Sequence, residues 1–167
     1  VLGVPGPRAE AVLRRLYGTL TCPIIVTNVQ SAELIKHASN SFLACKISFV
    51  NGVARLCEKT GANVEEVARG MGLDPRIGPG FLKAGIGYGG SCFGKDLDAF
   101  AEIAAELGYE FRLLREVQAI NRDQRAHVAA LLRSEVWVLR GKRIALLGLA
   151  FKPDTDDVRD APALSLA

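Results

Sequence analysis

One long stretch of helical periodicity, from Ser31 to Thr60, constrains the fold of this chain more than any other feature. Its apolar residues recur at steps of three and four, which is the repeat of one helix face: Leu34, Ile35, Ala38, Phe42, Cys45, Phe49, Val53, Leu56 and Cys57. Ser31 is the predicted N-cap, and Gly61 is predicted to end the helix. A helix of this length spans about 45 Å. A chain of 167 residues cannot cover all its apolar sides, so we expect the backbone of a helical domain or a dimer interface.

The remaining patterns predict a mainly α fold in which a long central helix and a helical dimerisation domain are flanked by partial α/β Rossmann-like pieces. Shorter helices are expected at Pro7–Leu20, Val64–Met71 (capped by Asn63), about Cys92–Leu107 and about Arg112–Arg133. The β-branched run Pro23–Thr27 predicts a short strand, and Ile144–Leu147 predicts a buried parallel strand. Residues 72–91 are predicted to form a loop. Core positions are expected for Trp137, Cys22, Cys45 and Cys57.

Composition and charge narrow the classes of function. A net charge of +3 with scattered basic residues gives no nucleic-acid footprint. No apolar run reaches the roughly 20 residues of a membrane span, and Arg14 and Arg15 interrupt any signal-peptide pattern. We therefore expect a cytoplasmic protein. The four cysteines show no CxxC spacing and there are only two histidines, so neither a metal site nor a disulfide framework is predicted.

The segment Gly85–Asp96 is the strongest candidate for chemistry. Its first half is rich in glycine, which lets the backbone turn tightly and approach a ligand closely. Ser91 is predicted to cap the following helix and so to put Cys92 in the first turn, where the helix dipole favours a thiolate. Lys95 adds positive charge, and Asp96 shares a helix face with Cys92. This pairing suits nucleophilic attack followed by activation of water; the alternative is a loop with a buried structural cysteine.

Two further stretches are weaker candidates. Lys36 and Asn40 lie four residues apart on one face of the long helix. A partly buried ammonium there would need an anionic partner or a developing oxyanion, although a solvated lysine is the commoner case. Residues 148–159 follow the expected last strand, at the strand end where α/β sheets place ligands. That loop lacks GxGxxG, so it does not by itself indicate a dinucleotide, and its alternative is an ordinary acidic turn.

Four ordered motifs together resemble the UDP-glucose/GDP-mannose dehydrogenase family. Pro23-Ile-Ile-Val-Thr27 is similar to the last strand of that family's NAD domain, and residues 31–51 are similar to its long central helix. Residues 74–93 resemble its substrate loop and nucleophile, and residues 148–160 resemble the start of its C-terminal domain. The resemblance implies three parts: residues 1–28 as the end of an NAD-binding domain, 29–134 as a central helical dimerisation and active-site domain, and 135–167 as the start of a domain that binds the UDP-sugar.

The resemblance also implies a reaction and a set of roles. Two NAD⁺ molecules would oxidise C6 of the sugar from alcohol to carboxylate through a thiohemiacetal and a thioester on Cys92. Lys36 would stabilise the oxyanion, Asn40 would hold the reacting oxygen or water, and Asp96 would position or deprotonate water. Arg76 would reach the substrate of a partner subunit in a homodimer formed through the long helix. Cys92, Lys95 and Arg159 would contact NAD. The implied substrate-binding residues are Phe81, Lys83, Ala84, Gly85, Tyr88, Gly89, Phe151 and Lys152.

UDP-glucose is the substrate that the motifs favour, with GDP-mannose or another nucleotide sugar as the alternative. Gly94 departs from the family pattern, because bacterial members commonly have proline there. No GxGxxG domain is present in this sequence, so we expect these 167 residues to be inactive alone. Two other readings stay open: a helical dimerisation module without its own catalysis, and a hydroxyacid-type dehydrogenase that needs no cysteine nucleophile.

Overall fold

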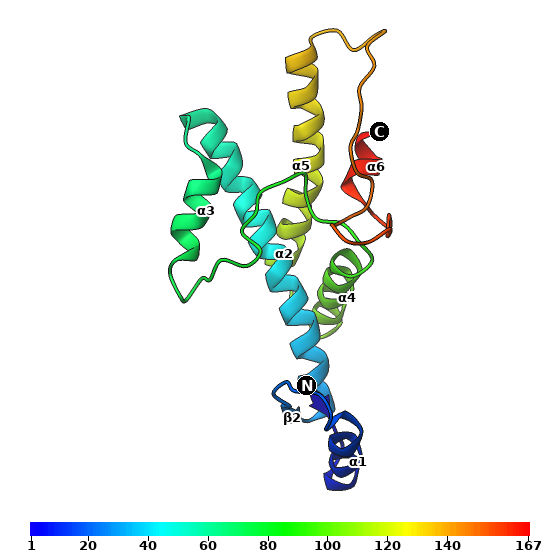
Figure 1. Ribbon diagram of the computed structural model, residues 1–167. Coiled ribbons are helices and arrows are strands. Elements are labelled where there is room, and N and C mark those ends of the chain that lie inside the picture. Colours follow the sequence, from blue (N-terminus) through cyan, green and yellow to red (C-terminus); the bar gives the residue numbers. More distant parts are fainter. The chain divides into compact units, whose positions relative to one another are not determined.

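The computed structural model describes residues 1–167 and contains six helices and two short strands (Figure 1). This composition confirms the expectation of a mainly α fold with one long central helix. The chain divides into two compact units, Val1–Ser39 and Asn40–Ala167. The long helix α2, Val29–Thr60, begins in the first unit and continues into the second.

The first unit is a small β-α-β arrangement. Strand β1, Leu2–Gly3, pairs in parallel with β2, Val26–Thr27, and helix α1, Pro7–Tyr17, connects them. Parallel strands joined through a helix are the repeating element of α/β folds, so this unit fits the expected partial Rossmann-like piece. The second strand is shorter than the predicted range 23–27, because its partner offers only two paired residues.

Helix α2 begins two residues before the predicted start. The side chain of Asn28 accepts a hydrogen bond from the backbone N–H of Ser31 at 2.7 Å, so the cap is Asn28, and the prediction of Ser31 was wrong. Gly61 ends the helix with φ +75° and donates its N–H to the carbonyl of Cys57 at 2.8 Å. A left-handed glycine of this kind is the common way to close a helix, as predicted.

The core of the second unit lies where α2, helix α4 (Phe93–Glu106) and helix α5 (Arg112–Val136) meet. Its buried members are Ala44, Tyr88, Leu97, Leu114 and Val117. Helix α4 packs on α5, and α5 packs on the short helix α6, Pro162–Leu166 (Figure 1). Tyr88 enters this core from the glycine-rich loop, so the core itself fixes one point of that loop.

Helix α3, Val64–Gly72, follows α2 after a short turn. Asn63 accepts a hydrogen bond from the N–H of Glu65 at 2.8 Å, which confirms the predicted cap. The predicted loop then carries the chain to α4. Lys46 of α2 donates to the carbonyls of Ile77 and Gly78 at 2.9 and 3.4 Å, which ties the first part of this loop to α2.

Several core and strand predictions were wrong. Residues 144–147 form no strand, and Leu147 is 92% exposed. A parallel strand needs a neighbour to take up its N–H and C=O groups, and no segment pairs with these residues. Trp137 follows the end of α5 with φ 57° and is 91% exposed instead of buried. Of the cysteines predicted to be buried, Cys57 is buried, Cys45 is half-buried and Cys22 is exposed.

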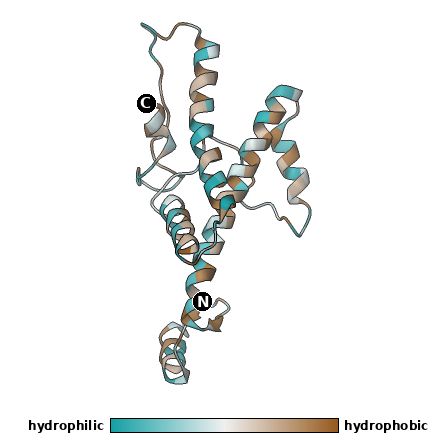
Figure 2. Cartoon of the chain, turned by 180° about the vertical axis from the view of Figure 1, so that it is seen from behind, coloured by the Kyte–Doolittle hydropathy of each residue, from teal (hydrophilic) through white to brown (hydrophobic).

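No helix is both long enough and apolar enough to cross a membrane. No group of three or more His, Cys, Asp or Glu side chains is placed to hold a metal ion. Apolar and polar residues alternate in short segments along α2 and α5 in the view coloured by hydropathy (Figure 2), as the amphipathic pattern predicts.

Candidate active site

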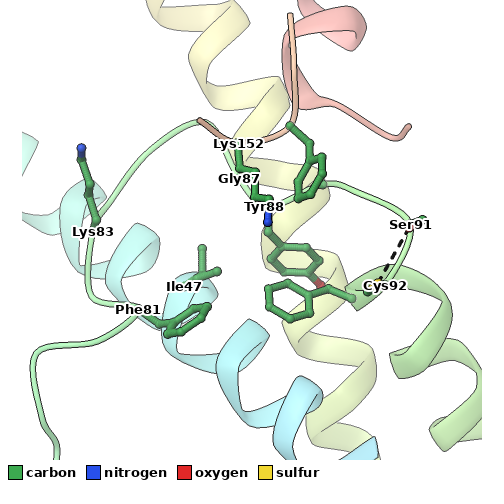
Figure 3. A pocket seen from close by; sticks show the side chains of 11 residues that line it. Ile47, Phe81, Lys83, Gly87, Tyr88, Ser91, Cys92 and Lys152 are labelled. Atoms are coloured by element: carbon green, nitrogen blue, oxygen red, sulfur yellow. Dashed lines mark hydrogen bonds between the residues drawn. The ribbon is translucent and has the colours of Figure 1, made fainter. Parts of the chain in front are cut away.

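A pocket of about 490 Å³ lies between the glycine-rich loop, the start of α4 and the segment that carries Phe151 (Figure 3). Its walls are mostly apolar, with two lysines and two small nucleophilic side chains among them. The lining residues are Ile47, Phe81, Lys83, Gly87, Tyr88, Gly89, Ser91, Cys92, Phe93, Phe151 and Lys152. Apolar walls with a few convergent polar groups are typical of a small-molecule site.

Cys92 occupies the N-cap position of α4, one residue before the predicted place in the first turn. Its carbonyl accepts the N–H of Asp96 at 3.0 Å, the first hydrogen bond of the helix. No side chain caps this helix, so the prediction that Ser91 caps it was wrong; the Ser91 hydroxyl instead lies 3.8 Å from the Cys92 sulfur. The thiol is exposed. The N-cap places it beside the free N–H groups of the first turn.

A buried polar pair lies one helical turn beyond Cys92. The Asn40 side-chain amide on α2 donates to a carboxylate oxygen of Asp96 on α4 at 2.5 Å. Asn40 is 9% exposed and Asp96 is 8% exposed. A buried carboxylate must be hydrogen-bonded to be tolerated, and a bond to an ionised acceptor is stronger than a neutral one. The two residues that the sequence predicted separately as catalytic are therefore in direct contact.

Side-chain amides hold the backbone of the glycine-rich loop. Asn121 of α5 accepts from the N–H of Tyr88 at 2.8 Å and donates to its carbonyl at 3.0 Å, as a neighbouring peptide group would. Gly85 donates its N–H to Asn51 of α2 at 2.8 Å, and its carbonyl accepts from Gln124 of α5 at 2.9 Å. These bonds satisfy backbone groups that a loop would otherwise leave unpaired, and they fix the loop to α2 and α5.

Two glycines of the loop are required by their surroundings. Gly87 has φ +106°, and a Cβ on it would lie 2.8 Å from the side-chain oxygen of Asn121. Gly90 has φ +83°, and a Cβ there would meet the Phe151 ring at 2.7 Å. Residues with a side chain rarely adopt this backbone conformation. The loop therefore lies directly against α5 and the Phe151 segment because it carries no side chains at these points.

Tyr88 joins the pocket to the core. Its ring meets the edge of the Phe93 ring at a centroid distance of 5.7 Å and an interplanar angle of 83°, a favourable aromatic arrangement. Burial raises the pKa of the Tyr88 hydroxyl to about 12. That hydroxyl is buried and has no hydrogen-bond partner.

The segment 151–160 forms the other wall of the pocket. Phe151 donates its N–H to the carbonyl of Asp157 at 3.0 Å, which folds the segment into a closed turn. Asp157 holds Arg159 through both carboxylate oxygens, and these bonds lower the pKa of Asp157 to about 2. The pKa of Arg159 is raised, first by that bond and in smaller part by the charge of Cys92.

Comparison with known proteins decides the family. The model of the UDP-glucose/GDP-mannose dehydrogenase family, central domain, matches residues 30–123. This chain belongs to that family. The chain is 50% identical over 166 residues to UDP-glucose 6-dehydrogenase TuaD of Bacillus subtilis, which covers 99% of the chain and 36% of that protein. It is 47% identical over 172 residues to the UDP-glucose 6-dehydrogenase of Rhizobium meliloti, covering 99% and 39%.

Solved structures of the same family share the fold. A UDP-glucose dehydrogenase from Pyrobaculum islandicum matches with a TM-score of 0.95 and 41% identity, over 99% of this chain and 38% of that one. A UDP-D-ManNAc dehydrogenase from Pyrococcus horikoshii matches with a TM-score of 0.82 and 32% identity, over 95% and 38%. The chain therefore spans less than two fifths of the length of these dehydrogenases.

For a member of this family, the predicted site residues other than Lys36 fall into three groups. Seven of them line the one pocket: Phe81, Lys83, Tyr88, Gly89, Cys92, Phe151 and Lys152. Asn40 and Asp96 form the buried pair. Five lie outside the pocket lining: Arg76, Ala84, Gly85, Lys95 and Arg159. Lys36 belongs to the Val1–Ser39 unit, and its predicted role remains a prediction.

Arg76 and Lys152 show how differently the predicted cations are held. The Arg76 side chain is 87% exposed and is bound to Asp74 at 2.6 Å, an interaction that raises the pKa of Arg76 and lowers that of Asp74. Lys152 places its ammonium 5.4 Å from the centroid of the Phe151 ring at the pocket wall, a cation–π distance. The positive charge of Lys152 therefore lies at the pocket wall, whereas that of Arg76 lies on the outer surface.

Sequence reasoning missed the residues of α5 that hold the glycine-rich loop. The buried face of α5 begins with Leu114 and Val117 and continues with Asn121 and Gln124. These positions recur at steps of three and four, so they lie on one helix face. The signal that could have found them is the change from apolar to amide side chains along that face, because buried amides need backbone or side-chain partners.

Proposed function

We propose that this chain is the central part of an NAD-dependent UDP-glucose 6-dehydrogenase, which oxidises C6 of UDP-glucose to give UDP-glucuronate. The observation that carries the proposal is the exposed Cys92 thiol at the N-cap of α4, in a pocket and one turn from the Asn40–Asp96 pair. A nucleophile beside a carboxylate that an amide orients is the arrangement needed for covalent catalysis followed by hydrolysis.

Cys92 would form the covalent bond. Its sulfur adds to the C6 aldehyde of the half-oxidised sugar and gives a thiohemiacetal, whose oxidation leaves a thioester on the same sulfur. The free N–H groups at the start of α4 stabilise the thiolate before attack. The Ser91 hydroxyl, 3.8 Å from the sulfur, is placed to donate to it. We expect the isolated 167 residues to be inactive, as the sequence predicts.

Asp96 and Asn40 would carry the hydrolytic step. The amide of Asn40 fixes the orientation of the Asp96 carboxylate, so the carboxylate can accept a proton from a water molecule that attacks the thioester. The products of that attack are the C6 carboxylate and the free Cys92 thiol. Lys36 would stabilise the oxyanion of the tetrahedral intermediate, as the family resemblance implies.

The pocket suits an anionic nucleotide sugar. Lys83 and Lys152 are the cationic residues of the pocket lining, and Phe81 and Phe151 provide apolar walls. Two cations with aromatic surfaces match a diphosphate attached to a ring system. Ala84, Gly85 and Gly89 would hold the sugar nucleotide through the backbone of the loop. Arg76 would act in trans on the site of a partner subunit, which agrees with its exposed side chain.

The residues of this chain fit one edge of an NAD site. Arg159 and Lys95 are both exposed, and Lys95 lies on the first turn of α4, close to Cys92 in the sequence. Both therefore offer cationic groups to an anionic cofactor. When bound, NAD⁺ supplies the hydride acceptor for each of the two oxidations. Arg159 is held in place by Asp157 at 2.7 Å, so its guanidinium is already oriented.

We also propose a homodimer formed through α2. Phe42, Phe49 and Leu56 recur at seven-residue steps, and they are 66, 56 and 63% exposed. A stripe of large apolar side chains at this spacing is typical of a helix that packs against a partner helix. This stripe favours residues 29–134 as the dimerisation and active-site domain, between a cofactor-binding region at 1–28 and a UDP-sugar-binding region from 135 onward. Because all four cysteines are free thiols, we propose a reducing, cytoplasmic location.

The test uses the full-length protein, with NADH absorbance followed in the presence of UDP-glucose, GDP-mannose and UDP-N-acetylmannosamine. Two NADH per UDP-glucose, with no turnover of the other sugars, is the expected result. Cys92→Ala is expected to reduce turnover by roughly 10³-fold or more, with Cys45→Ala as the matched control. Turnover of GDP-mannose instead of UDP-glucose would change the assigned substrate but leave the proposed mechanism intact.

The competing function is a dimerisation module without its own chemistry, which the exposed stripe on α2 also supports. Two measurements separate it from the dehydrogenase. UDP-glucose should protect Cys92 from alkylation in the full-length enzyme, whereas a dimerisation module would give dimers with no protection and no turnover. A hydroxyacid-type enzyme would retain its activity after Cys92→Ser.

A further inference from the structure

Arg125 of α5 joins the glycine-rich loop to the segment that carries Arg159. One guanidinium nitrogen donates to the carbonyl of Tyr88 at 3.0 Å and to the carbonyl of Asp160 at 3.4 Å. The other terminal nitrogen donates to the Asp160 carboxylate at 2.9 Å. The Arg125 side chain is only 19% exposed. A half-buried fork of this kind fixes two backbone segments in one geometry, which a point charge cannot do.

The two segments that Arg125 joins are in close contact. The N–H of Gly90 donates to the carbonyl of Arg159 at 2.9 Å. A Cβ on Gly89 would lie 2.1 Å from the carbonyl oxygen of Asp160, so the loop has no spare room on that side. Asp160 itself has φ 46°, a conformation that residues other than glycine rarely adopt. Such strain persists only where neighbouring contacts hold the residue in place.

We propose, on the basis of the function proposed above, that Arg125 is a positioning residue for Cys92. Arg125 holds the Tyr88 end of the glycine-rich loop and the Arg159–Asp160 segment together, and so sets the place of the Cys92 thiol between them. The loop runs directly from Tyr88 through Gly89, Gly90 and Ser91 to Cys92. Only three residues separate Tyr88 from Cys92, so a shift of the Tyr88 carbonyl would also move the Cys92 sulfur. Arg125 itself does not line the pocket, and its hydrogen bonds go to Tyr88 and Asp160, not to Cys92.

The test compares Arg125→Met, Arg125→Lys and Arg133→Met in the full-length protein. Methionine keeps the apolar length and removes the donors, and lysine keeps the charge without the fork. Arg133 lies near the end of the same helix and is exposed, so it is the matched control. Four quantities are measured: kcat and KM with UDP-glucose, the rate of Cys92 alkylation by iodoacetamide without substrate, and the melting temperature.

The expected result is a fall in kcat for Arg125→Met by about tenfold to a hundredfold, the cost of misplacing a reacting group by about 1 Å. KM should change far less, and the alkylation rate of Cys92 should differ from wild type. The kcat and the Cys92 alkylation rate of Arg125→Lys should lie between those of wild type and Arg125→Met, and both values for Arg133→Met should match wild type. All assays are run below the lowest melting temperature of the set.

Two outcomes would overturn the proposal. Arg125→Met could melt earlier and yet retain wild-type kcat and Cys92 alkylation, in which case Arg125 only stabilises the fold. A raised KM with unchanged kcat and alkylation would make it a substrate contact. If the wild-type protein makes no NADH with any nucleotide sugar, the proposed function fails by itself. The alkylation rates then still decide whether Arg125 positions Cys92.

Discussion

Asn40 and Asp96 join α2 to α4 through a hydrogen bond of 2.5 Å between two buried side chains. The bond crosses 56 positions of sequence, and it fixes the carboxylate one turn beyond Cys92. Leu97 beside it is completely buried, so α4 has little freedom to rotate about its axis. A carboxylate held this firmly keeps one orientation, which the proposed role of Asp96 as a general base would need.

Replacing Asp96 by asparagine should separate chemistry from folding. The change keeps the shape and an acceptor oxygen for Asn40 but removes the charge, so we expect stability to fall by less than about 2 kcal/mol. Turnover in the full-length protein should fall by about 10² to 10⁴-fold, the usual contribution of a general base. Asp98→Asn is the control, because Asp98 lies on the same helix and is exposed, where it accepts from Gln118 at 2.6 Å. Equal kinetics for the two variants would remove Asp96 from the mechanism.

A second prediction concerns the space around the glycine-rich loop. Gly89→Ala would bring a methyl group to 2.1 Å from the Asp160 carbonyl and 2.7 Å from Pro162. The Asp160 backbone could move away only at a considerable cost in energy, so we expect a loss of about 1–3 kcal/mol in the free energy of unfolding. Urea denaturation measures it.

Gly94→Ala provides the contrast for that measurement. Gly94 lies in the first turn of α4, and its nearest neighbour would be a carboxylate oxygen of Asp160 at 4.0 Å. Alanine there should therefore stabilise the protein by about 0.5–1 kcal/mol. A stabilising Gly89→Ala would show that the loop and the Asp160 segment are not in contact in solution.

A third prediction orders the four cysteines by their reactivity. Cys92 and Cys22 are exposed, whereas Cys57 is buried. Burial raises the pKa of the Cys45 thiol, which lowers its thiolate fraction at neutral pH. Under native conditions iodoacetamide should therefore modify Cys92 and Cys22 first, with Cys45 and Cys57 reacting at comparable rates only after denaturation. Peptide mass spectrometry at timed intervals gives the four rates. Modification of Cys45 as fast as Cys92 would contradict the packing of α2.

Local patterns predicted the helices well, because each depends on signals within its own residues. The apolar repeat gave α2 within two residues of its start, and Gly61 ended it as expected. The cap was wrong because Asn28 and Ser31 are both good capping residues three positions apart. The end of the preceding strand β2 sets where the helix starts, and so which of the two residues is the N-cap. The position of β2 is fixed by its pairing with β1.

Predictions that needed a partner from elsewhere in the chain failed or were missing. The apolar run at Ile144 has the composition of a buried strand, but burial requires a neighbouring strand that this chain does not supply. Asn40 and Asp96 could each be predicted as a candidate, but their contact could not. They are 56 positions apart in the sequence, and that separation does not reveal how far apart they lie in space. Asn121 and Arg125 were missed as a pair because both bind the backbone carbonyl of Tyr88, and the sequence does not show which backbone group a distant side chain will meet.

The last prediction uses the buried hydroxyl of Tyr88. Its pKa is raised from 10.0 to about 12 because burial disfavours the phenolate, so the folded state keeps its proton at a pH where the unfolded state loses it. The stability that depends on this proton is fully present below pH 10 and is lost as the pH rises from 10 towards 12. Tyr88→Phe removes the titrating group, and with it a buried hydroxyl that has no partner. At pH 8 the variant should therefore match or exceed wild type in urea denaturation, and its advantage should grow between pH 10 and 11.5. Tyr109→Phe is the matched control, since Tyr109 is 61% exposed and should leave the pH dependence unchanged. Parallel curves for wild type and Tyr88→Phe across this range would show that the Tyr88 hydroxyl reaches water in the folded protein.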